Sequence, residues 1–369
     1  MPDPQAPTAD VAVPVRRVAA IVVSWRQVDQ LAACLEALEA QRHPQFEVVV
    51  VENASGDGSL EVLRAAASRD RRHPLTIVAN PSNRGFSGGV HDGLAAARPA
   101  DAVWLVNVDA IPAPDHLERL VAVLASDPAC AAVQGQLVRS QVGPDGTEVL
   151  DSTGVEATRA RLFRDRDEGR PVASSAREAG EVFGVTGACA LYRSTALEQV
   201  RWRDGSILTG ELFAYFEDVD LAWRLQRFGW TCRYEPRALA THERGGAGPR
   251  RSAFVEELNA ANRLLVLATH DRWRTLGRSS PLVVVTTVLK WAELALSVPS
   301  AWLPALRRTI RGWRAARARR DELDQRAPVA ATDVVARWFG PFRWRPWVAT
   351  WWRRIRGRAP GVAGGGRPR

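Results

Sequence analysis

The residues best suited to chemistry form an acidic cluster inside an apolar segment. Residues 211–230 read ELFAYFEDVDLAWRLQRFGW, where the carboxylates of Glu211, Glu217, Asp218 and Asp220 stand among large apolar side chains. The apolar residues that follow repeat at helical spacing, so the acids mark the start of a helix that Asp218 can cap. Carboxylates at such a place are costly to bury unless they are paired, bind metal or exchange a proton. The segment therefore predicts a functional site.

A second acid and a histidine stand at the ends of other apolar runs. Asp109 ends the run AVWLVNVDA, and His242 ends a run just downstream of the acidic cluster. Carboxylate and imidazole groups can hold a divalent cation, while another carboxylate accepts a proton. The set suggests a metal-assisted transfer site. Taken singly, Asp109 is equally typical of a helix cap and His242 of a polar residue with a satisfied partner.

The elements that must position these residues alternate between strand and helix. Continuous apolar, β-branched runs typical of buried strands occupy residues 18–25, 46–55, 75–80, 102–110 and 130–138. Helical periodicity occupies residues 31–41, 60–67 and 116–126. Regular alternation predicts an α/β fold with a doubly wound, mostly parallel sheet, whose ligands bind at the carboxyl ends of strands. The polar residues that close the runs, and so mark that edge, are Glu52, Asn53, Asn83 and Asp109.

Two glycine-containing segments follow predicted strands. Residues 52–61, ENASGDGSLE, make a poor dinucleotide fingerprint because Glu61 stands where its third glycine belongs. Glu52 and Asn53 could instead bond a nucleobase or ribose, although a simple capping turn explains the pattern as well. Residues 83–93, NRGFSGGVHDG, are expected to form a loop that lets a ligand approach the backbone, with Arg84 placed to meet a pyrophosphate. A flexible turn is the alternative.

Length and composition indicate one large domain with an appendage. The 369 residues are 46% hydrophobic and 25% charged, as in globular proteins. Residues 1–15 are Pro-rich, lack an apolar signal core and are expected to be disordered, which favours a cytoplasmic protein. The four cysteines are far apart and fit no metal-binding spacing, in keeping with a reducing compartment.

The C-terminal region differs from the rest in charge. Residues 301–369 hold 17 arginines against four acids, together with half of the 14 tryptophans. Residues 281–308 are apolar, but Lys290, Glu293 and two prolines interrupt them, so we expect an interfacial membrane helix and no clear spanning one. An amphipathic helix packed on the catalytic domain is the alternative. The arginines match no motif that reads nucleic acid, so we expect no nucleic-acid partner.

The whole set resembles a known family. Its matching segments, in the family's order, are AAIVVSW, VVVVENASGDGS, NRGFSGG, VWLVNVDAIPAPDHL, GVTGACALYRSTAL, FAYFEDVDLAWRLQRFGW and ATHERGG. The chain resembles family 2 glycosyltransferases of the GT-A fold, and its bacterial rhamnosyltransferase-like members most. The resemblance covers about residues 17–270 and leaves the Arg- and Trp-rich region unexplained. We therefore predict residues 1–15 as a disordered N-terminus, 16–270 as the GT-A domain, and 271–369 as a helical, basic, membrane-associating extension.

On the donor side, the resemblance implies that Glu52 occupies the position of an aspartate that contacts the nucleobase. Asn107, Val108 and Asp109 take the DxD position, in which Asp109 is the expected ligand of Mg²⁺ or Mn²⁺, and His242 completes the metal shell. The remaining predicted donor-binding residues are Asn53, Asn83, Arg84 and Gly85. Three positions depart from the family pattern: Glu52 is longer than aspartate, Asn107 replaces an acid, and Val90 and His91 stand where asparagine is frequent.

On the acceptor side, the resemblance implies that Asp218 is the general base, with Glu217 beside it as a second catalytic residue. Asp220, Gly187 and Ala188 are expected to line the acceptor pocket, although capping or surface roles would also explain Glu217 and Asp220. The position of Asp218 near a helix N-terminus predicts a low pKa.

The expected activity is transfer of a sugar with inversion from a nucleotide diphosphate-sugar to a hydroxyl group. The resemblance favours dTDP-rhamnose as donor, with UDP-sugars next. The acceptor is expected to be a polyprenyl-linked or cell-envelope glycan, reached by a cytoplasmic enzyme peripheral to the inner face of the cell membrane. The alternative is a catalytically inactive protein that binds nucleotide sugars or glycans. A nucleotidyltransferase would normally carry a Gly-rich, Lys-bearing signature near its N-terminus, and this chain has none.

Overall fold

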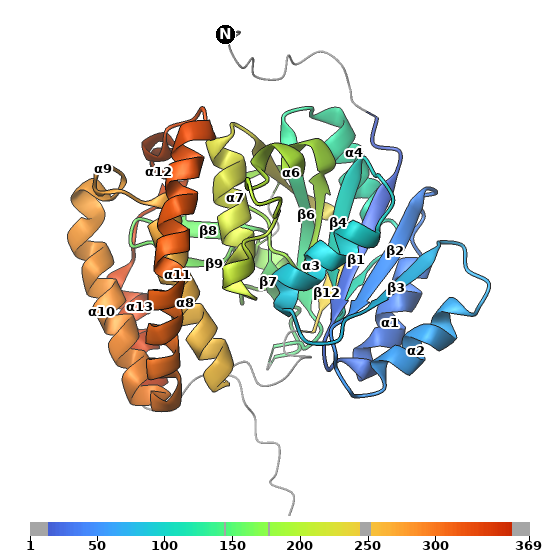
Figure 1. Ribbon diagram of the computed structural model, residues 1–369, viewed down its shortest axis with the longest axis horizontal. Coiled ribbons are helices and arrows are strands. Elements are labelled where there is room, and N and C mark those ends of the chain that lie inside the picture. Colours follow the sequence, from blue (N-terminus) through green and yellow to red (C-terminus); the bar gives the residue numbers. More distant parts are fainter. Residues whose placement is uncertain (1–13, 144, 176–177, 244–251, 356–369) are drawn as a thin grey trace, which may run out of the picture.

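The computed structural model describes residues 14–355, apart from residue 144, residues 176–177 and residues 244–251. In this part of the chain, ten strands form one central sheet with helices on both faces, and a further layer of helices covers one side (Figure 1). The α/β architecture agrees with the prediction from alternating runs. Residues 1–13 of the predicted disordered N-terminus lie outside the description, whereas Val15 is buried in the core and so belongs to the folded domain.

The sheet is mostly parallel and follows the order β10-β12-β6-β11-β4-β1-β2-β3. Its strands are β1 (Val18–Ser24), β2 (Phe46–Glu52), β3 (Leu75–Ala79), β4 (Ala102–Asn107), β6 (Cys130–Arg139), β10 (Gly180–Val182), β11 (Cys189–Arg193) and β12 (Thr231–His242), with β5 (Ala110–Pro112) on β12 and β7 (Leu150–Ser152) on β6. Strands β3, β2, β1 and β4 run parallel, and β12 runs parallel to β6. Strand β11 lies antiparallel between β4 and β6. The carboxyl ends of β4 and β12 therefore reach the same edge.

Helices cover both faces because the buried strands are apolar on both sides. Val18, Ala20 and Val22 of β1 face one core, which is covered by α1 (Val28–Glu39), α2 (Ser59–Ala67) and α4 (His116–Ser126). Ala19 and Ile21 face the other core, which is covered by α3 (Gly85–Ala96), α6 (Ser194–Val200) and α7 (Glu217–Arg227). This alternation is that of a doubly wound sheet.

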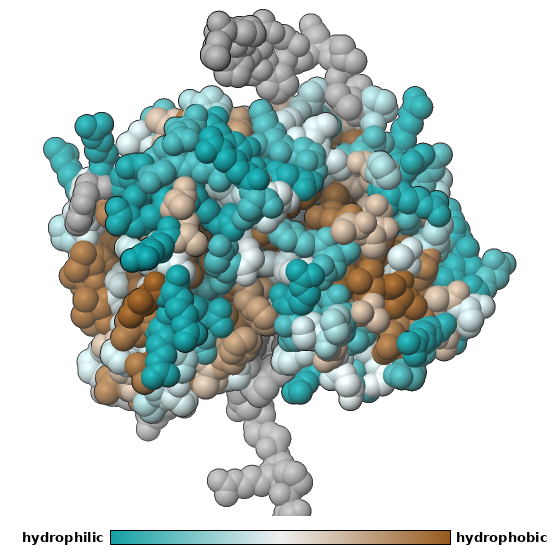
Figure 2. All heavy atoms as spheres, viewed as in Figure 1, coloured by the Kyte–Doolittle hydropathy of each residue, from teal (hydrophilic) through white to brown (hydrophobic). Residues whose placement is uncertain are grey.

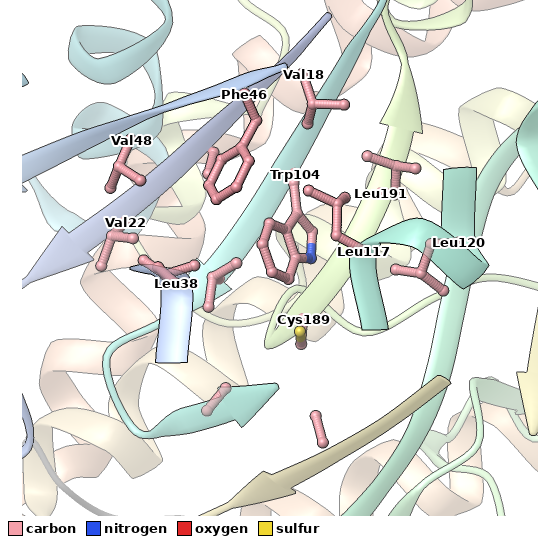
Figure 3. Close-up of a cluster of buried hydrophobic side chains, with 14 of the residues drawn as sticks. Val18, Val22, Leu38, Phe46, Val48, Trp104, Leu117, Leu120, Cys189 and Leu191 are labelled. Carbon is pink, nitrogen blue, oxygen red and sulfur yellow. The ribbon is translucent and has the colours of Figure 1, made fainter. Parts of the chain in front are cut away.

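Trp104 of β4 anchors the first core. Its ring is fully buried, meets Phe46 edge to face with ring centroids 6.3 Å apart, and stacks on His116 at 5.9 Å. Figure 3 shows Trp104 between Phe46 and Leu117, with Cys189 beneath it. The four cysteines are all buried and unpaired, and burial raises the pKa of the Cys189 thiol well above its usual range. They act as small apolar side chains.

The glycine-rich segment is mostly helix, and its prediction as a loop is wrong. Helix α3 begins at Gly85, and glycines further along it lie against the sheet. A Cβ at Gly89 would stand 2.6 Å from Cγ1 of Val23, and one at Gly93 would stand 2.6 Å from Cγ2 of Ile21. These glycines bring the helix close to β1, so only the start of the segment is left to contact a ligand.

Residues 140–180 form short strands and turns. Besides β7 and β10 they contain β8 (Val155–Thr158), β9 (Phe163–Asp165) and α5 (Val172–Ser175). Strand β8 pairs with β9 and, in a second sheet, with the C-terminal strand β13 (Phe339–Gly340).

The C-terminal region is helical, as predicted. After β12 the chain forms α8 (Ala253–His270), the short turns α9 (Trp273–Leu276) and η2 (Gly277–Ser279), α10 (Ser280–Ser297), α11 (Pro299–Arg326), α12 (Ala331–Trp338), β13 and α13 (Trp344–Ile355). This region packs on the sheet domain through a third core that includes the outer side of α7. Two ion pairs join the layers: Nε of the buried Arg161 lies 3.0 Å from Oδ2 of Asp271, and Nη2 of Arg227 lies 2.9 Å from Oδ1 of Asp324. Residues 271–355 are therefore joined to the sheet domain by buried contacts.

Part of this helical layer presents apolar side chains to solvent. The exposed large residues are Val284, Val285, Val288 and Leu296 of α10, Trp302, Leu303, Ile310 and Trp313 of α11, and Trp344 and Trp352 of α13. Figure 2 shows apolar surface at the left edge, where Figure 1 places α10 and α11. Arg307, Arg311 and Arg314 are exposed beside it on α11. We call this set the apolar-basic face.

By length and composition alone, the helical segment Arg274–Ser297 is long and apolar enough to cross a membrane. The sequence analysis expected an interfacial helix here and no clear spanning one, because Lys290 and Glu293 interrupt the apolar run. In the structure these two residues lie one turn apart, with Nζ of Lys290 3.7 Å from a Glu293 oxygen.

Candidate active site

Asp109 and His242 lie together at the carboxyl edge of the sheet. Strand β4 ends at Asn107, and the chain turns through Asp109 into β5, which pairs with the end of β12 so that Ala110 stands opposite His242. Oδ1 of Asp109 is 3.3 Å from Nε2 of His242, and both side chains are buried. Sheet topology thus joins two residues that are far apart in the sequence.

Asp151 holds the other side of the histidine ring. Its Oδ2 lies 2.7 Å from Nδ1 of His242, and Asp151 itself is 1% exposed. Burial alone would lower the pKa of His242, but its contacts with Asp109 and Asp151 raise that pKa to about 9. A carboxylate that accepts the Nδ1–H of a histidine leaves Nε2 free to bind a metal ion. The sequence analysis did not single out Asp151.

The donor set at this edge fits a divalent cation. Asp109 offers an oxygen and His242 a nitrogen, a combination that Mn²⁺ and Mg²⁺ accept, and the negative surroundings that stabilise a proton on His242 also favour a cation. Within residues 14–355 as described, no group of three or more His, Cys, Asp or Glu side chains has the arrangement of a complete metal site.

Glu217 and Asp218 begin α7, directly after Phe216. Oδ1 of Asp218 accepts a hydrogen bond of 2.7 Å from the backbone N–H of Val219, and its Oδ2 lies 3.4 Å from the backbone nitrogen of Gly187. Glu217 is 9% exposed, and its Oε2 has no hydrogen-bond partner among the described residues. The structure places Asp218 inside the first turn, where it is not the residue that caps the helix.

The predicted low pKa of Asp218 is wrong. Burial raises the pKa of Asp218, although hydrogen bonds from Val219, Gly187 and Thr186 oppose the shift. Burial also raises the pKa of Glu217 to about 8, and the neighbouring charge of Asp218 adds to that rise. Since Asp218 has the hydrogen-bond donors, we assign the negative charge of the pair to Asp218 and the proton to Glu217. Desolvation outweighs the helix dipole here.

The turn at residues 186–189 connects the two halves of the site. Ala188 accepts a 2.7 Å hydrogen bond from the backbone N–H of Asn107, two residues before Asp109, while Gly187 faces Asp218. A Cβ at Gly187 would lie 3.6 Å from the ring of Phe86 and 3.9 Å from Oε1 of Glu217. The end of β4 and the start of α7 therefore meet across one short turn.

The predicted donor-side residues surround the ends of β2 and β3. Glu52 is buried and accepts a 2.7 Å hydrogen bond from the backbone N–H of Ser55. The amide of Asn53 is 1% exposed, donates to Oδ1 of Asn83 and the carbonyl of Gly85, and accepts from Asn80 and the backbone of Arg84. Every polar atom of the Asn53 side chain is thus used to shape the turn into α3.

The remaining donor-side residues differ in accessibility. Oδ1 of Asn83 accepts from the backbone N–H of Gly85, which has a positive φ of 70°. The side chain of Arg84 is half exposed and pairs with Asp92. Asn53 and Asn83 therefore shape this turn, whereas Arg84 remains accessible to a ligand. His91, noted as a departure from the family pattern, accepts hydrogen bonds of 3.0 and 3.1 Å from the backbone of Ile207 and Leu208.

Two members of the acidic cluster have structural partners. Asp220 is buried. Its Oδ2 lies 2.9 Å from Nη2 of Arg224 and accepts a 2.8 Å hydrogen bond from the hydroxyl of Thr209, and its Oδ1 lies 2.9 Å from Nε2 of His270. Burial by itself would raise the pKa of Asp220, but these partners hold it well below its usual range. Both oxygens of Asp220 are occupied, and this favours the capping or structural role over the predicted one in the acceptor pocket. Glu211 lies in η1 (Gly210–Leu212) and pairs with Arg319 of α11 at 2.8 Å.

The family model described as glycosyltransferase-like family 2 matches residues 14–263. The chain belongs to this family. The match ends within α8, and the comparison therefore covers the central sheet, the acidic cluster and both halves of the site.

Curated relatives of this glycosyltransferase are distant. Poly-beta-1,6-N-acetyl-D-glucosamine synthase of Staphylococcus epidermidis is 20% identical over 221 residues, which are 59% of this chain and 48% of the relative. The pre-mycofactocin glycosyltransferase of Mycobacterium tuberculosis is 29% identical over 169 residues, which are 46% of this chain and 32% of the relative. The chain thus spans about half or less of the length of these relatives.

Among solved structures, GalNAc-T7 in complex with UDP, GalNAc and Mn²⁺ superposes with a TM-score of 0.54 at 11% identity, covering 78% of this chain and 58% of the other. At that identity the likeness concerns the fold alone. It agrees with the GT-A architecture expected from the sequence.

Some site residues of the glycosyltransferase escaped the sequence analysis. Asp151 follows an irregular stretch without a periodic pattern, and the sequence analysis gave Thr186 no role, although it belongs to a quoted motif. Their partners come from distant elements, so only a three-dimensional arrangement reveals them.

Proposed function

We propose that this glycosyltransferase transfers a hexose, with inversion, from a nucleotide diphosphate-sugar to a hydroxyl of a lipid-linked or cell-envelope glycan, with Asp218 as general base. The observation that carries the proposal is the buried pair of Glu217 and Asp218 facing the turn at residues 186–187. A buried carboxylate held by backbone donors beside a protonated neighbour is suited to accept a proton.

The chemistry of the pair follows from its surroundings. The acceptor oxygen forms a bond to the anomeric carbon while the bond from that carbon to the diphosphate breaks, and the acceptor proton passes to Asp218. A direct displacement of this kind inverts the configuration at the anomeric carbon. The raised pKa of Asp218 makes it a stronger base than an exposed aspartate. Glu217, held protonated, leaves the charge on Asp218.

On the donor side, Asp109 and His242 would hold Mg²⁺ or Mn²⁺, with Asp151 orienting the histidine ring. When bound, the cation supplies positive charge to the diphosphate leaving group. We propose that Glu52, at the end of β2, contacts the nucleobase of the donor and that Arg84 contacts a phosphate. Asn107 places an amide where the family pattern has an acid, so Asp109 is the carboxylate of that motif.

For the donor, dTDP-rhamnose is our first candidate because of the sequence motifs, and UDP-sugars are the second. The names of the relatives support a nucleotide sugar in general, since the solved neighbour carries UDP and the staphylococcal relative is named for an N-acetylglucosamine polymer.

For the acceptor and location, we propose a glycan at the cytoplasmic face of the cell membrane. The apolar-basic face of α10, α11 and α13 supports this, because exposed tryptophan and aliphatic side chains beside arginines suit the interface of an anionic bilayer.

The decisive experiment is a thermal-shift panel of UDP-, dTDP- and GDP-sugars with and without Mn²⁺, followed by turnover assays with the donor that binds. Stabilisation by one nucleotide class that requires the metal, with release of nucleoside diphosphate on turnover, supports a transferase. Absence of any shift and of any release contradicts it.

The alternative is a catalytically inactive protein that binds nucleotide sugars or glycans, and the observation that favours it is Asn107 in place of an acid. Binding without release of nucleoside diphosphate, with acceptors or water, would support this alternative.

A further inference from the structure

The segment that leads into the catalytic helix has a strained backbone. Phe213, Tyr215 and Phe216 have positive φ angles of 63°, 68° and 71°, a region that residues other than glycine seldom adopt. Such conformations persist only where the surroundings impose them, and they concentrate at functional sites. The segment ends one residue before Glu217, so its shape sets the position of Glu217 and Asp218.

One buried side chain holds this segment from the opposite layer. Asn262 lies in the middle of α8 with no exposed surface. Its Nδ2 lies 2.7 Å from the carbonyl oxygen of Leu212, 2.8 Å from that of Ala214 and 2.9 Å from that of Tyr215. The amide nitrogen carries two N–H donors, which the three converging carbonyls share, whereas a carboxylate could only repel them. Asparagine is also a poor helix former, so propensity does not account for it.

The same segment is joined to the donor side. The carbonyl of Phe213 accepts a 3.0 Å hydrogen bond from the backbone N–H of Ser87, in the first turn of α3. Gly85 lies directly against it, because a Cβ there would stand 2.5 Å from the carbonyl oxygen of Phe213. Asn262 therefore fixes a segment that contacts the donor-side helix at one end and the catalytic pair at the other.

We propose that Asn262 is a positioning residue for the transfer reaction, which acts through the backbone of residues 212–216. This inference rests on the proposed function of Glu217 and Asp218. By holding the strained segment, Asn262 keeps the first turn of α7 against the turn at residues 186–187 and keeps Glu217 buried. Among the residues that the structure describes, the side-chain hydrogen bonds of Asn262 all go to carbonyls of this segment, so its effect reaches the reaction only through that segment.

The test compares Asn262→Asp, Asn262→Leu and Asn262→Gln with Asn259→Asp, a partly exposed asparagine one turn earlier on the same helix. We expect kcat to fall at least tenfold in the aspartate and leucine variants, with donor KM and nucleotide Kd within about twofold of wild type, and glutamine to restore part of kcat. Release of the segment exposes the catalytic pair, so the acid limb of the pH–kcat profile should also move to lower pH. Asn259→Asp should change neither quantity. Aspartate conserves the volume of Asn262, whereas leucine and glutamine are larger at this fully buried site, so circular dichroism and melting curves will establish the folded fraction of each variant at assay temperature.

Three outcomes overturn the inference. The first is wild-type kcat in folded Asn262→Leu, the second is a loss that only matches the unfolded fraction, and the third is a pH profile that does not move. If wild-type protein releases no nucleoside diphosphate from any donor, the transferase proposal fails and this inference fails with it. If wild type is active and the variants are unaffected, only the role of Asn262 is rejected.

Discussion

The backbone N–H of Gly187 points at Oδ2 of Asp218 across 3.4 Å, and this contact ties helix α7 to the sheet. Ala188, the next residue, bonds the end of β4 through Asn107. A turn of small residues thus sits between the strand end that leads to Asp109 and the helix that carries Asp218. A Cβ at Gly187 would stand 3.9 Å from Oε1 of Glu217, so this turn lies directly against the start of α7.

The first prediction concerns Asp218 as the proposed general base. Asp218→Asn removes the proton acceptor but keeps the shape, so turnover should fall by about 10²–10⁴-fold. Nucleotide affinity, measured by calorimetry, should stay within about twofold, because Asp218 does not belong to the donor side. Asp70→Asn, at an exposed position, is the matched control. Normal turnover by Asp218→Asn would reject the base assignment.

The second prediction concerns pH. The folded-state pKa of Glu217 is raised from 4.5 to about 8, so the folded protein binds a proton that the unfolded chain releases between these values. The stabilisation from this proton is complete below about pH 4.5 and is lost as pH rises through about 8. Glutamine has no proton to release in this range, so the Glu217→Gln variant lacks this dependence of stability on pH. The melting temperature of the glutamine variant minus that of wild type should therefore increase as pH rises from 5 to 9. Parallel curves for the two proteins would contradict the assignment of the proton to Glu217.

The third prediction concerns the metal. Asp151→Asn weakens the hold on the His242 ring, and loss of such an outer partner typically lowers metal affinity by about 10–100-fold. The readout is Mn²⁺ titration of thermal stability in the presence of UDP. The exposed Asp29→Asn serves as the control and should leave the Mn²⁺ titration unchanged. An unchanged Mn²⁺ midpoint in Asp151→Asn would show that this carboxylate does not support the site.

The fourth prediction separates structure from catalysis in the acidic cluster. Asp220→Ala leaves Arg224 buried without its partner, so the free energy of unfolding should fall by about 3–5 kcal/mol. Urea denaturation measures this loss, with Asp70→Ala as the control. The acceptor KM of the folded fraction should not change. A stable variant with a raised acceptor KM would restore the acceptor-binding role.

The fifth prediction concerns the apolar-basic face. Val288→Glu combined with Ile310→Glu places two charges on it and should reduce binding to vesicles containing anionic lipid at least tenfold. Val142→Glu, an equally exposed position away from this face, should bind like wild type. Sedimentation with vesicles gives the comparison, and equal binding of both variants would contradict a membrane role for α10 and α11.

The local elements were largely predictable from the sequence. Buried parallel strands are continuous apolar runs, so the runs that contain β1, β2 and β4 could be recognised without knowledge of their neighbours. Helix α4 was predicted at its observed residues, 116–126, because its periodicity is regular. The start of α3 was missed, because glycines that permit close helix–sheet packing have the same composition as a loop.

What the sequence determined by itself was the class of fold and the residue types at the carboxyl edge of the sheet, since both follow from short-range pattern. Only the tertiary structure decided the partners of each acid. Asp109, Asp151 and His242 converge because β7 and the carboxyl ends of β4 and β12 belong to one sheet, in which β5 pairs with β12 and β7 pairs with β6. Asp220 and Asp218 lie two residues apart on one helix, yet one faces an internal arginine and the other the turn at residue 187. Burial, pairing and pKa depend on contacts between distant segments, which the order of residues does not specify.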